Sequence, residues 1–241
     1  MSLLVYGINH RTAPLQLREK IAFGESEQPQ SIKNLLSNNC SVEECFIVST
    51  CNRTEVYCSI KSENSENIRD WLTNEKPVSN EELLNCSYEY WDSDMVSHMS
   101  RVACGLDSMA LGEPQIMGQV KKSIETANQC NSIGENLDLA IRAAVSAAKE
   151  VRTRSKIGEN AVSIAYAASS LATKIFSDLS QKKALLIGAG ETIEMVASYL
   201  HRKKIGSLTI ANRTISNAEA LARRYKARTA SLSNVNSSLH E

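Results

Sequence analysis

The hydrophobic residues of the first ninety positions follow two patterns, one typical of strands and one typical of helices. Short apolar runs rich in Val, Ile, Tyr and Phe predict strands at Leu3–Ile8, Glu44–Ser49 and Thr54–Ile60. Apolar residues at helical spacing predict helices over Ser26–Asn38 and Ser65–Thr73. Because the two kinds of element alternate, this part of the chain is expected to form a small α+β domain.

From residue 92 onward the pattern becomes helical and then alternates again. Helical spacing predicts three successive helices over residues 92–104, 114–130 and 134–154. A fourth predicted helix, Ser163–Leu179, leads to an apolar strand at Lys183–Gly188, an amphipathic helix and a second strand at Ser207–Ala211. A buried strand, a helix and a second strand in this order indicate the start of a parallel βαβ sheet.

Composition narrows the class of protein. The chain has 241 residues, 42% of them hydrophobic, with 27 basic and 27 acidic residues, so it is long enough for two modest domains and lacks the large basic excess of non-specific nucleic-acid binders. No apolar stretch reaches the roughly 18 residues of a membrane-spanning helix, and the N-terminus has no basic export signal. A cytoplasmic protein without a membrane partner is therefore expected.

The seven cysteines show no spacing that indicates a structural role for disulfides or metal. Their number is odd, no pair is spaced as CxxC, and no histidines cluster near them. Neither a disulfide framework nor a metal site is expected.

The segment Gly188-Ala189-Gly190 has the position of a phosphate-binding turn. It falls between a predicted strand and a predicted helix, where glycines allow close approach of a pyrophosphate and the helix N-terminus supplies free N–H groups. The third glycine of the usual fingerprint is replaced by Ile193, so the prediction of a dinucleotide site depends on the order strand, glycine turn, helix and strand rather than on the motif alone. The alternative is a tight strand-to-helix turn without a ligand. With this motif the expected fold class is α/β and α+β: a small α+β domain joined by helices to a partial Rossmann-type domain.

The end of the second predicted strand favours NADP over NAD. An NAD enzyme needs a carboxylate roughly 20 residues beyond the glycines, whereas this chain has Asn212-Arg213-Thr214. An arginine there can bind a 2′-phosphate, although it can also be an exposed residue that opens the next helix. Only about 30 residues follow Arg213, fewer than a complete domain of this type needs, so the chain is expected to be part of a longer protein.

Cys51 is the candidate nucleophile. It lies in the predicted turn between two strands and is followed by Asn52 and Arg53, so it is accessible and has a guanidinium nearby that can stabilise a thiolate or hold an anionic substrate. An incidental thiol is the alternative. His98, on a predicted helix, can point either into the core or into a site.

Several long segments resemble one family. They are YGINHRTAPLQLRE at residues 6–19, STCNRTE at 49–55, HMSR at 98–101, GLDSM at 105–109 and GEPQI at 112–116, continuing to Gly118-Gln119. Together they resemble the glutamyl-tRNA reductase family, and the resemblance extends over essentially all 241 residues.

The resemblance implies an enzyme and a domain order. It implies an N-terminal catalytic domain over residues 1–155 and a truncated Rossmann-type NADPH-binding domain over residues 156–241, with the family's C-terminal dimerisation domain absent. The implied activity is NADPH-dependent reduction of glutamyl-tRNA(Glu) to glutamate-1-semialdehyde through a cysteine thioester, the first step of five-carbon tetrapyrrole (heme and porphyrin) biosynthesis. The implied partners are glutamyl-tRNA(Glu), glutamate-1-semialdehyde aminotransferase and, in the full-length family, a second copy of the chain.

The resemblance also implies roles for individual residues. Cys51 falls on the nucleophile that forms the thioester, which suits a thiolate because it is both a good nucleophile and a good leaving group. His98 falls on the histidine near the reacting centre, and Cys104 stands where Ala or Ser is expected. The substrate-binding positions are Thr50, Arg53, Ser108, Glu113 and Gln119, with Arg53 as partner of the substrate carboxylate. The cofactor-binding positions are Gly188, Ala189, Gly190, Glu191, Asn212, Arg213 and Thr214.

Two other functions remain open from the residues alone. The chain can be an NADP-linked oxidoreductase of a small metabolite that forms no thioester, or a truncated, non-catalytic binding module. An unreactive Cys51 together with loss of NADPH binding would favour the binding module.

Overall fold

The structure, a computed structural model, describes residues 1–38, 41–61, 64–155, 157 and 164–235 of the chain. These residues form two compact units, Met1–Ala161 and Val162–Glu241. Each unit has its own hydrophobic core.

The first unit is built on a four-stranded antiparallel sheet with strand order β2-β3-β1-β4. Strand β1 (Ser2–Asn9) pairs with β3 (Arg53–Ile60) on one side and with β4 (Tyr88–Trp91) on the other, and β2 (Val42–Ser49) pairs with the free side of β3. All eight residues of β3 are buried. A strand in the middle of a sheet that is covered on both faces must bury both sets of its alternating side chains, the polar ones included.

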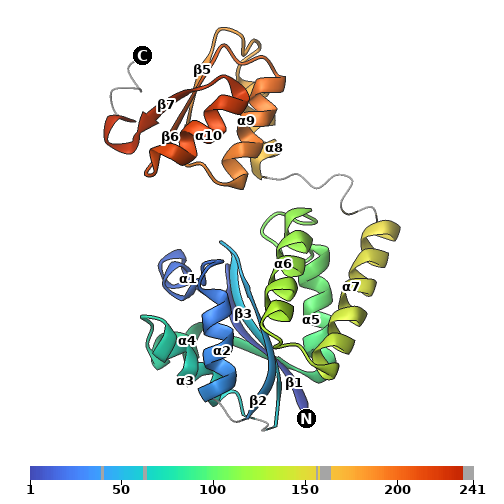
Figure 1. Ribbon diagram of the computed structural model, residues 1–241. Coiled ribbons are helices and arrows are strands. Elements are labelled where there is room, and N and C mark those ends of the chain that lie inside the picture. The colour runs from blue at the N-terminus through green and yellow to red at the C-terminus, as the bar shows by residue number, and fades with distance from the viewer. Residues whose placement is uncertain (39–40, 62–63, 156, 158–163, 236–241) are drawn as a thin grey trace. The chain divides into compact units, whose positions relative to one another are not determined.

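Helices cover both faces of this sheet (Figure 1). One face carries α1 (Leu15–Ile21), α2 (Gln28–Asn38), α3 (Glu66–Glu75) and α4 (Asn80–Cys86), and the other carries α5 (Asp92–Cys104), α6 (Gln115–Gln129) and α7 (Glu135–Ser155). The buried carboxylate of Glu44 on β2 accepts the backbone N–H groups of Gly134, Asn136 and Leu137 at the start of α7. It thereby satisfies donors that a helix N-terminus would otherwise leave unpaired.

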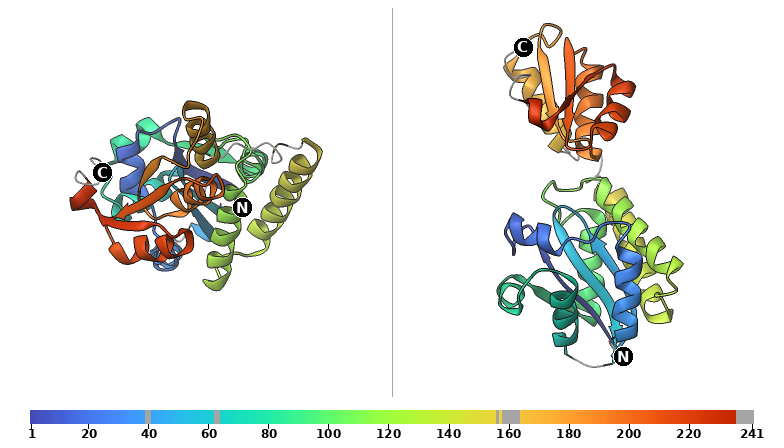
Figure 2. Two further views of the ribbon diagram at one scale, coloured as in Figure 1. Left: turned by 90° about the horizontal axis from the view of Figure 1, so that it is seen from above. Right: turned by 60° about the vertical axis from the view of Figure 1, so that its left-hand side comes forward.

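The second unit is a three-stranded parallel sheet with helices packed against it (Figure 2). Its strand order is β5-β6-β7, and its elements are α8 (Ile164–Ile175), β5 (Lys183–Ile187), α9 (Glu191–Arg202), β6 (Ser207–Asn212), α10 (Ile215–Tyr225), β7 (Arg228–Ser231) and the short 3₁₀ helix η1 (Leu232–Asn234). Strands joined by helices in this order give the parallel βαβαβ arrangement of a Rossmann-type half-domain.

The predicted fold class is confirmed. The predicted strands appear within a residue or two of their expected bounds, whereas α1, α4, β4, α10 and β7 were not predicted. The helix predicted over Ser163–Leu179 ends at Ile175, and its predicted first residue lies outside the described residues. Beyond that end, the carboxylate of Asp178 accepts both the N–H and the hydroxyl of Ser180, so local Asp–Ser turn chemistry replaces the last helical turn.

Three further observations concern the described residues. None of the helices there is long and apolar enough to cross a membrane, and no group of three potential metal ligands comes together. All six described cysteines are free, while Cys40 lies outside the described residues.

Candidate active site

Cys51 lies at the tip of the turn that joins β2 to β3. The Thr50 hydroxyl accepts the N–H groups of Asn52 and Arg53 at 3.2 Å each, and the Thr50 N–H donates to the Arg53 carbonyl at 2.8 Å. A guanidinium nitrogen of Arg18, on α1, donates to the Cys51 carbonyl. These bonds fix the backbone of the turn, while Cys51 itself is exposed.

The protein around the turn raises the pKa of the Cys51 thiol above its ordinary value. Partial loss of hydration is the largest cause and the carboxylate of Glu113 is the second, and together they outweigh a backbone hydrogen bond at Cys51 and the charge of Arg18, which both lower the pKa. The thiol is therefore largely protonated at neutral pH, so a proton must leave it before it can act as a nucleophile.

Arg53, two residues after Cys51, is buried with only 1% of its surface exposed. Its Nη1 lies 2.7 Å from Glu55 Oε1, and its Nη2 lies 3.0 Å from Asp107 Oδ2 and also donates to the Asp107 carbonyl. The sequence predicts that Arg53 binds a substrate carboxylate, and that role stays a prediction. In the structure the guanidinium is enclosed and already holds two carboxylates, because Arg53 points inward from the central strand.

Glu55 connects Arg53 to His98. Its carboxylate, 0% exposed, accepts the Tyr57 and Tyr88 hydroxyls and lies 2.7 Å from His98 Nε2. Burial alone would raise the pKa of Glu55, but the Arg53 guanidinium and the His98 contact outweigh it and lower the pKa to about 2. Because Glu55 is ionised at neutral pH, His98 Nε2 donates to it, which fixes the orientation of the imidazole ring.

A pocket of about 380 Å³ opens beside His98. Its walls are the turn after β1, strand β4, one face of α5, and Asp107. The Tyr90 ring stacks on His98, with centroids 4.7 Å apart and an angle of 27° between the rings. The volume falls within the range of small-molecule sites, roughly 300–1,000 Å³.

The pocket and the Cys51 turn share a wall. Asn9, the last residue of β1, lines the pocket together with Arg11 and Thr12 of the following turn, and within this turn the His10 N–H donates to the Asn52 carbonyl at 2.8 Å. Arg11 Nη1 also lies 3.1 Å from Asp107 Oδ1. One residue therefore separates the edge of the pocket from the turn that carries the thiol.

The loop between α5 and α6, together with α6 itself, supplies the remaining predicted substrate residues. Ser108 is buried, and its hydroxyl has no hydrogen-bond partner among the described residues, as expected of a group that meets a ligand. Glu113 is half-buried and electrostatically coupled to Cys51, and Gln119 is half-buried on α6. Arg152, on α7, holds the loop through the carbonyls of Cys104 and Glu113.

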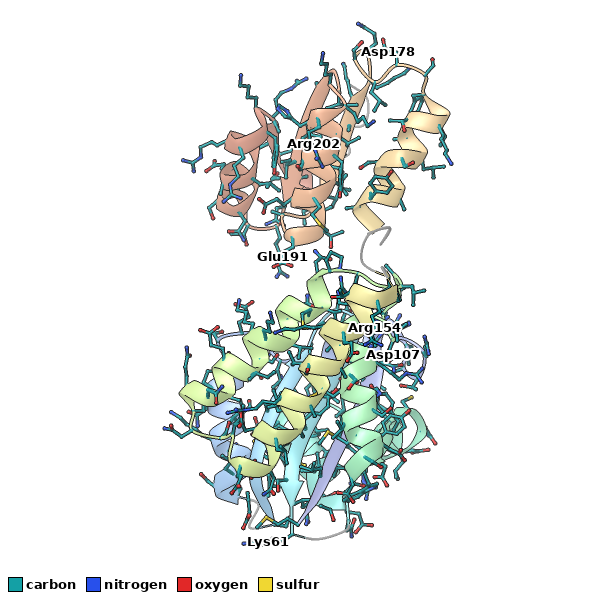
Figure 3. The ribbon with its side chains drawn as sticks, turned by 90° about the vertical axis from the view of Figure 1, so that its right-hand side faces the viewer. Lys61, Asp107, Arg154, Asp178, Glu191 and Arg202 are labelled. Carbon is teal, nitrogen blue, oxygen red and sulfur yellow. The ribbon has the colours of Figure 1, made fainter. Side chains whose placement is uncertain are left out.

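Asp107 in this loop and Arg154 at the end of α7 lie at the same end of the first unit, opposite Lys61 (Figure 3). The candidate site is therefore at one end of the sheet. Of the described cysteines Cys51 is the exposed one, and Cys104, whose thiol donates to the Arg101 carbonyl, is only 1% exposed. Burial makes Cys104 a poor competitor as the reactive thiol.

In the second unit the predicted dinucleotide segment has a suitable backbone. Gly188 has φ of +116°, and a Cβ there would lie 3.3 Å from Ile193, so glycine is required. The segment continues through Ala189 to Gly190, which precedes α9 and has open space where a Cβ would lie. The amides at this helix N-terminus suit a pyrophosphate, although Glu191, exposed on the first turn (Figure 3), adds a negative charge there.

The predicted 2′-phosphate residues follow β6. The Asn212 side chain donates to the Thr214 carbonyl at 2.9 Å, and both Arg213 and Thr214 are exposed. The bond between Asn212 and Thr214 fixes the conformation of this loop, while the guanidinium of Arg213 stays accessible. An accessible guanidinium at this position fits an NADP-type dinucleotide.

Sequence reasoning missed Glu55, Asp107, Tyr90 and Arg101 as parts of the site. A signal for Glu55 exists, because residues two apart on a strand share a face, so Arg53 and Glu55 had to lie side by side. The other three come together only through the packing of α5 and its following loop against β1 and β4.

Known proteins resemble both units. The sequence profile of the glutamyl-tRNA(Glu) reductase N-terminal domain matches residues 6–155, and that of shikimate/quinate 5-dehydrogenase matches residues 170–241. The second match indicates a dinucleotide-binding unit of the NADP-type oxidoreductases.

Similar proteins extend over the whole chain. Curated glutamyl-tRNA reductases from Pseudoalteromonas translucida and Hahella chejuensis are 43% and 46% identical over all 241 residues, which cover 57% of each relative. The solved glutamyl-tRNA reductase from Methanopyrus kandleri matches with 30% identity and a TM-score of 0.64, over 97% of this chain and 55% of that one. The chain thus spans a little over half the length of these relatives. It belongs to the glutamyl-tRNA reductase family.

Proposed function

We propose that the chain carries the thioester-forming site of a glutamyl-tRNA reductase and part of its NADPH-binding domain. The observation that carries the proposal is the exposed Cys51 on a rigid turn, two residues from the buried Arg53–Glu55–His98 network. The Cys51 thiolate attacks the ester carbonyl of glutamyl-tRNA(Glu), a C–S bond forms, and the ester C–O bond breaks, so that the terminal ribose hydroxyl of the tRNA leaves.

The surrounding residues have distinct proposed roles. His98, oriented by Glu55, faces the pocket and takes part in proton transfer around the reacting carbonyl. The unpartnered hydroxyl of Ser108 contacts the substrate, with Thr50, Glu113 and Gln119 as further contacts. Arg53 holds the turn in place through its buried ion pairs.

NADPH, when bound, supplies the hydride that reduces the thioester to glutamate-1-semialdehyde and frees the thiol. The residues proposed to hold the dinucleotide are those of the Gly188–Glu191 and Asn212–Thr214 segments. The required backbone of Gly188 and the accessible Arg213 support this assignment.

The wider assignments follow from family membership. We propose residues 1–155 as the catalytic domain and 156–241 as part of the NADPH domain, a cytoplasmic location, and the first step of tetrapyrrole biosynthesis as the reaction. Glutamate-1-semialdehyde aminotransferase and a second copy of the chain are the proposed partners of the complete enzyme.

The test is to mix the chain, without NADPH, with tRNA carrying radiolabelled glutamate. Wild-type protein should acquire label that hydroxylamine releases, because hydroxylamine cleaves thioesters. Cys51→Ala should acquire none, whereas the matched control Cys86→Ala, a half-buried thiol on α4, should label like the wild type. Equal labelling of Cys51→Ala and wild type would refute the assignment of the nucleophile, and an unlabelled wild type would refute thioester formation by this chain.

A further inference from the structure

Two buried cysteines, Cys45 on β2 and Cys58 on β3, lie directly opposite each other in the sheet of the first unit. Both are 0% exposed and both are free. Side chains that face each other across neighbouring strands point to the same face of the sheet. The next pair along the hairpin, Phe46 and Tyr57, points to the other face, where Tyr57 bonds Glu55. The two thiols therefore lie on the face of the sheet that points away from the Glu55 network.

The hydrogen bonds of the hairpin place these two cysteines in a close pair. At the end of the hairpin the Thr50 N–H donates to the Arg53 carbonyl. Hydrogen-bonded pairs recur at every second position from there, which makes Cys45 and Cys58 a non-hydrogen-bonded pair. The Cys45 N–H accordingly points away from β3 and donates to the Ser132 carbonyl at 2.8 Å. The Cα atoms of such a pair are about 4.5 Å apart, within the range of about 4.4–6.8 Å that a disulfide needs.

A third cysteine, Cys130, connects this buried pair with the surface. It follows the last residue of α6, is half-buried, and its thiol donates to the Pro29 carbonyl on α2 at 3.9 Å. Ser132, which accepts the Cys45 N–H, is two residues further along the chain. Loss of hydration and then the neighbouring Cys130 raise the pKa of Cys45 to about 12, and burial also raises the pKa of Cys58. Because buried thiols of raised pKa react slowly, an oxidant has to react first with Cys130.

We infer that Cys130, Cys45 and Cys58 form a redox site at which a hydroperoxide produces a Cys45–Cys58 disulfide. The Cys130 thiolate attacks the hydroperoxide, the O–O bond breaks, and Cys130 becomes a sulfenic acid while an alcohol, or water in the case of hydrogen peroxide, is released. The Cys45 sulfur attacks the sulfenic acid, and a Cys45–Cys130 disulfide forms with loss of water. Cys58 then displaces Cys130, which leaves as a thiol. In sum, two thiols lose two electrons and two protons to one hydroperoxide.

The disulfide would join the two strands that carry the Cys51 turn. Cys45 lies six residues before Cys51 and Cys58 lies seven residues after it, so the link closes a short loop that contains the thiol. Because the strands already pair in this register, the link needs no change of fold, and dithiothreitol should reverse it. The inference goes beyond the proposed function, since none of its steps uses Cys51 or a thioester.

The experiment treats the folded protein with hydrogen peroxide, blocks the remaining thiols under denaturing conditions, and identifies linked peptides by tandem mass spectrometry. The wild type should give a Cys45–Cys58 link that dithiothreitol removes. Cys130→Ser should slow formation of this link by about tenfold, because the first thiol to react is missing. The matched control Cys86→Ser removes another half-buried thiol and should form the link at the wild-type rate. Cys58→Ala should accumulate the Cys45–Cys130 link, because the last exchange is blocked.

Three results would overturn the inference. The first is a wild type without the Cys45–Cys58 link, and the second is equal rates of linkage in the wild type and in Cys130→Ser. The third is linkage of Cys45 or Cys58 to Cys51, which would show oxidation of unfolded chains. Urea unfolding of each variant before treatment checks that folded proteins are compared, and Cys130→Ala replaces Cys130→Ser if the latter does not fold.

Discussion

The buried Glu55 carboxylate offers the sharpest test of the site's electrostatics. Glu55→Gln preserves the shape of the side chain and removes its charge. Glu55 is fully buried and faces Arg53, His98 and two tyrosine hydroxyls, so the substitution leaves Arg53 with Asp107 alone. Breaking a buried ion pair by removing one partner costs about 3–5 kcal/mol. Because Asp107 remains, we expect the lower end of this range.

The pH dependence follows from the pKa of Glu55, which is about 2 in the folded protein against an ordinary value of 4.5. At about 1.4 kcal/mol per pKa unit, the ionised carboxylate contributes about 3 kcal/mol to the free energy of unfolding at neutral pH. A lowered folded pKa means that this contribution is present above the ordinary pKa and is lost as the pH falls toward 2. About 2 kcal/mol of it should be gone at pH 3.

The assay is urea unfolding of the wild type and of Glu55→Gln from pH 7 to pH 3. The wild type should be more stable at pH 7, and its advantage should shrink by about 2 kcal/mol on reaching pH 3. Glu150→Gln is the control, because Glu150 forms an exposed pair with Arg154 that contributes only about 0.3–0.5 kcal/mol. If the free energies of unfolding of wild type and Glu55→Gln run parallel from pH 7 to pH 3, Glu55 is not held in its ionised form by the network in the folded protein.

Three other predictions concern separate parts of the molecule. Glu44→Ala leaves three backbone N–H groups at the start of α7, of which that of Leu137 is buried, without their acceptor and should lower the free energy of unfolding by about 1–3 kcal/mol, and an unchanged urea midpoint would contradict this. Glu113→Gln removes a charge that raises the pKa of Cys51, so alkylation by iodoacetamide at pH 7 should accelerate, and equal rates would contradict the coupling. Gly188→Ala forces a side chain onto φ of +116° beside Ile193 and should weaken NADPH binding, measured by fluorescence titration, and an unaltered Kd would argue against this turn as the cofactor site.

The sequence patterns predict helices that bury a regular stripe of apolar residues and strands that consist of an apolar run. Leu3–Ile8 and Lys183–Gly188 are apolar runs, and both are strands in the structure. The strand Tyr88–Trp91 was missed because it has only four residues, none of them fully buried, and only its pairing with β1 makes it a strand. Short elements of this kind depend on tertiary contacts rather than on local preference.

The candidate site shows the same division. The glycine turn and the exposed Cys51 are local features, so a turn between two strands and a strand–glycine–helix order were enough to predict them. The environment of Arg53 is not local, because its partner Asp107 is 54 positions away in the chain. A charged residue in a strand reads as exposed unless the sheet is known to be covered on both faces and a carboxylate is known to meet it.

Arg53 connects the turn that carries the exposed Cys51 thiol to a buried ion-pair network. Loss of activity on substituting Arg53 therefore has two possible causes. The thiol of Cys51 is accessible, yet the chain two residues later is fixed by ion pairs to Glu55 and Asp107 that are costly to break. Loss of thioester formation in Arg53→Ala is therefore expected whether the guanidinium binds the substrate or holds the turn. Alkylation of Cys51 by iodoacetamide without substrate separates the two roles. If Arg53 holds the turn, the rate of alkylation and its pH profile should change in Arg53→Ala, whereas a residue that only binds substrate would leave both as in the wild type.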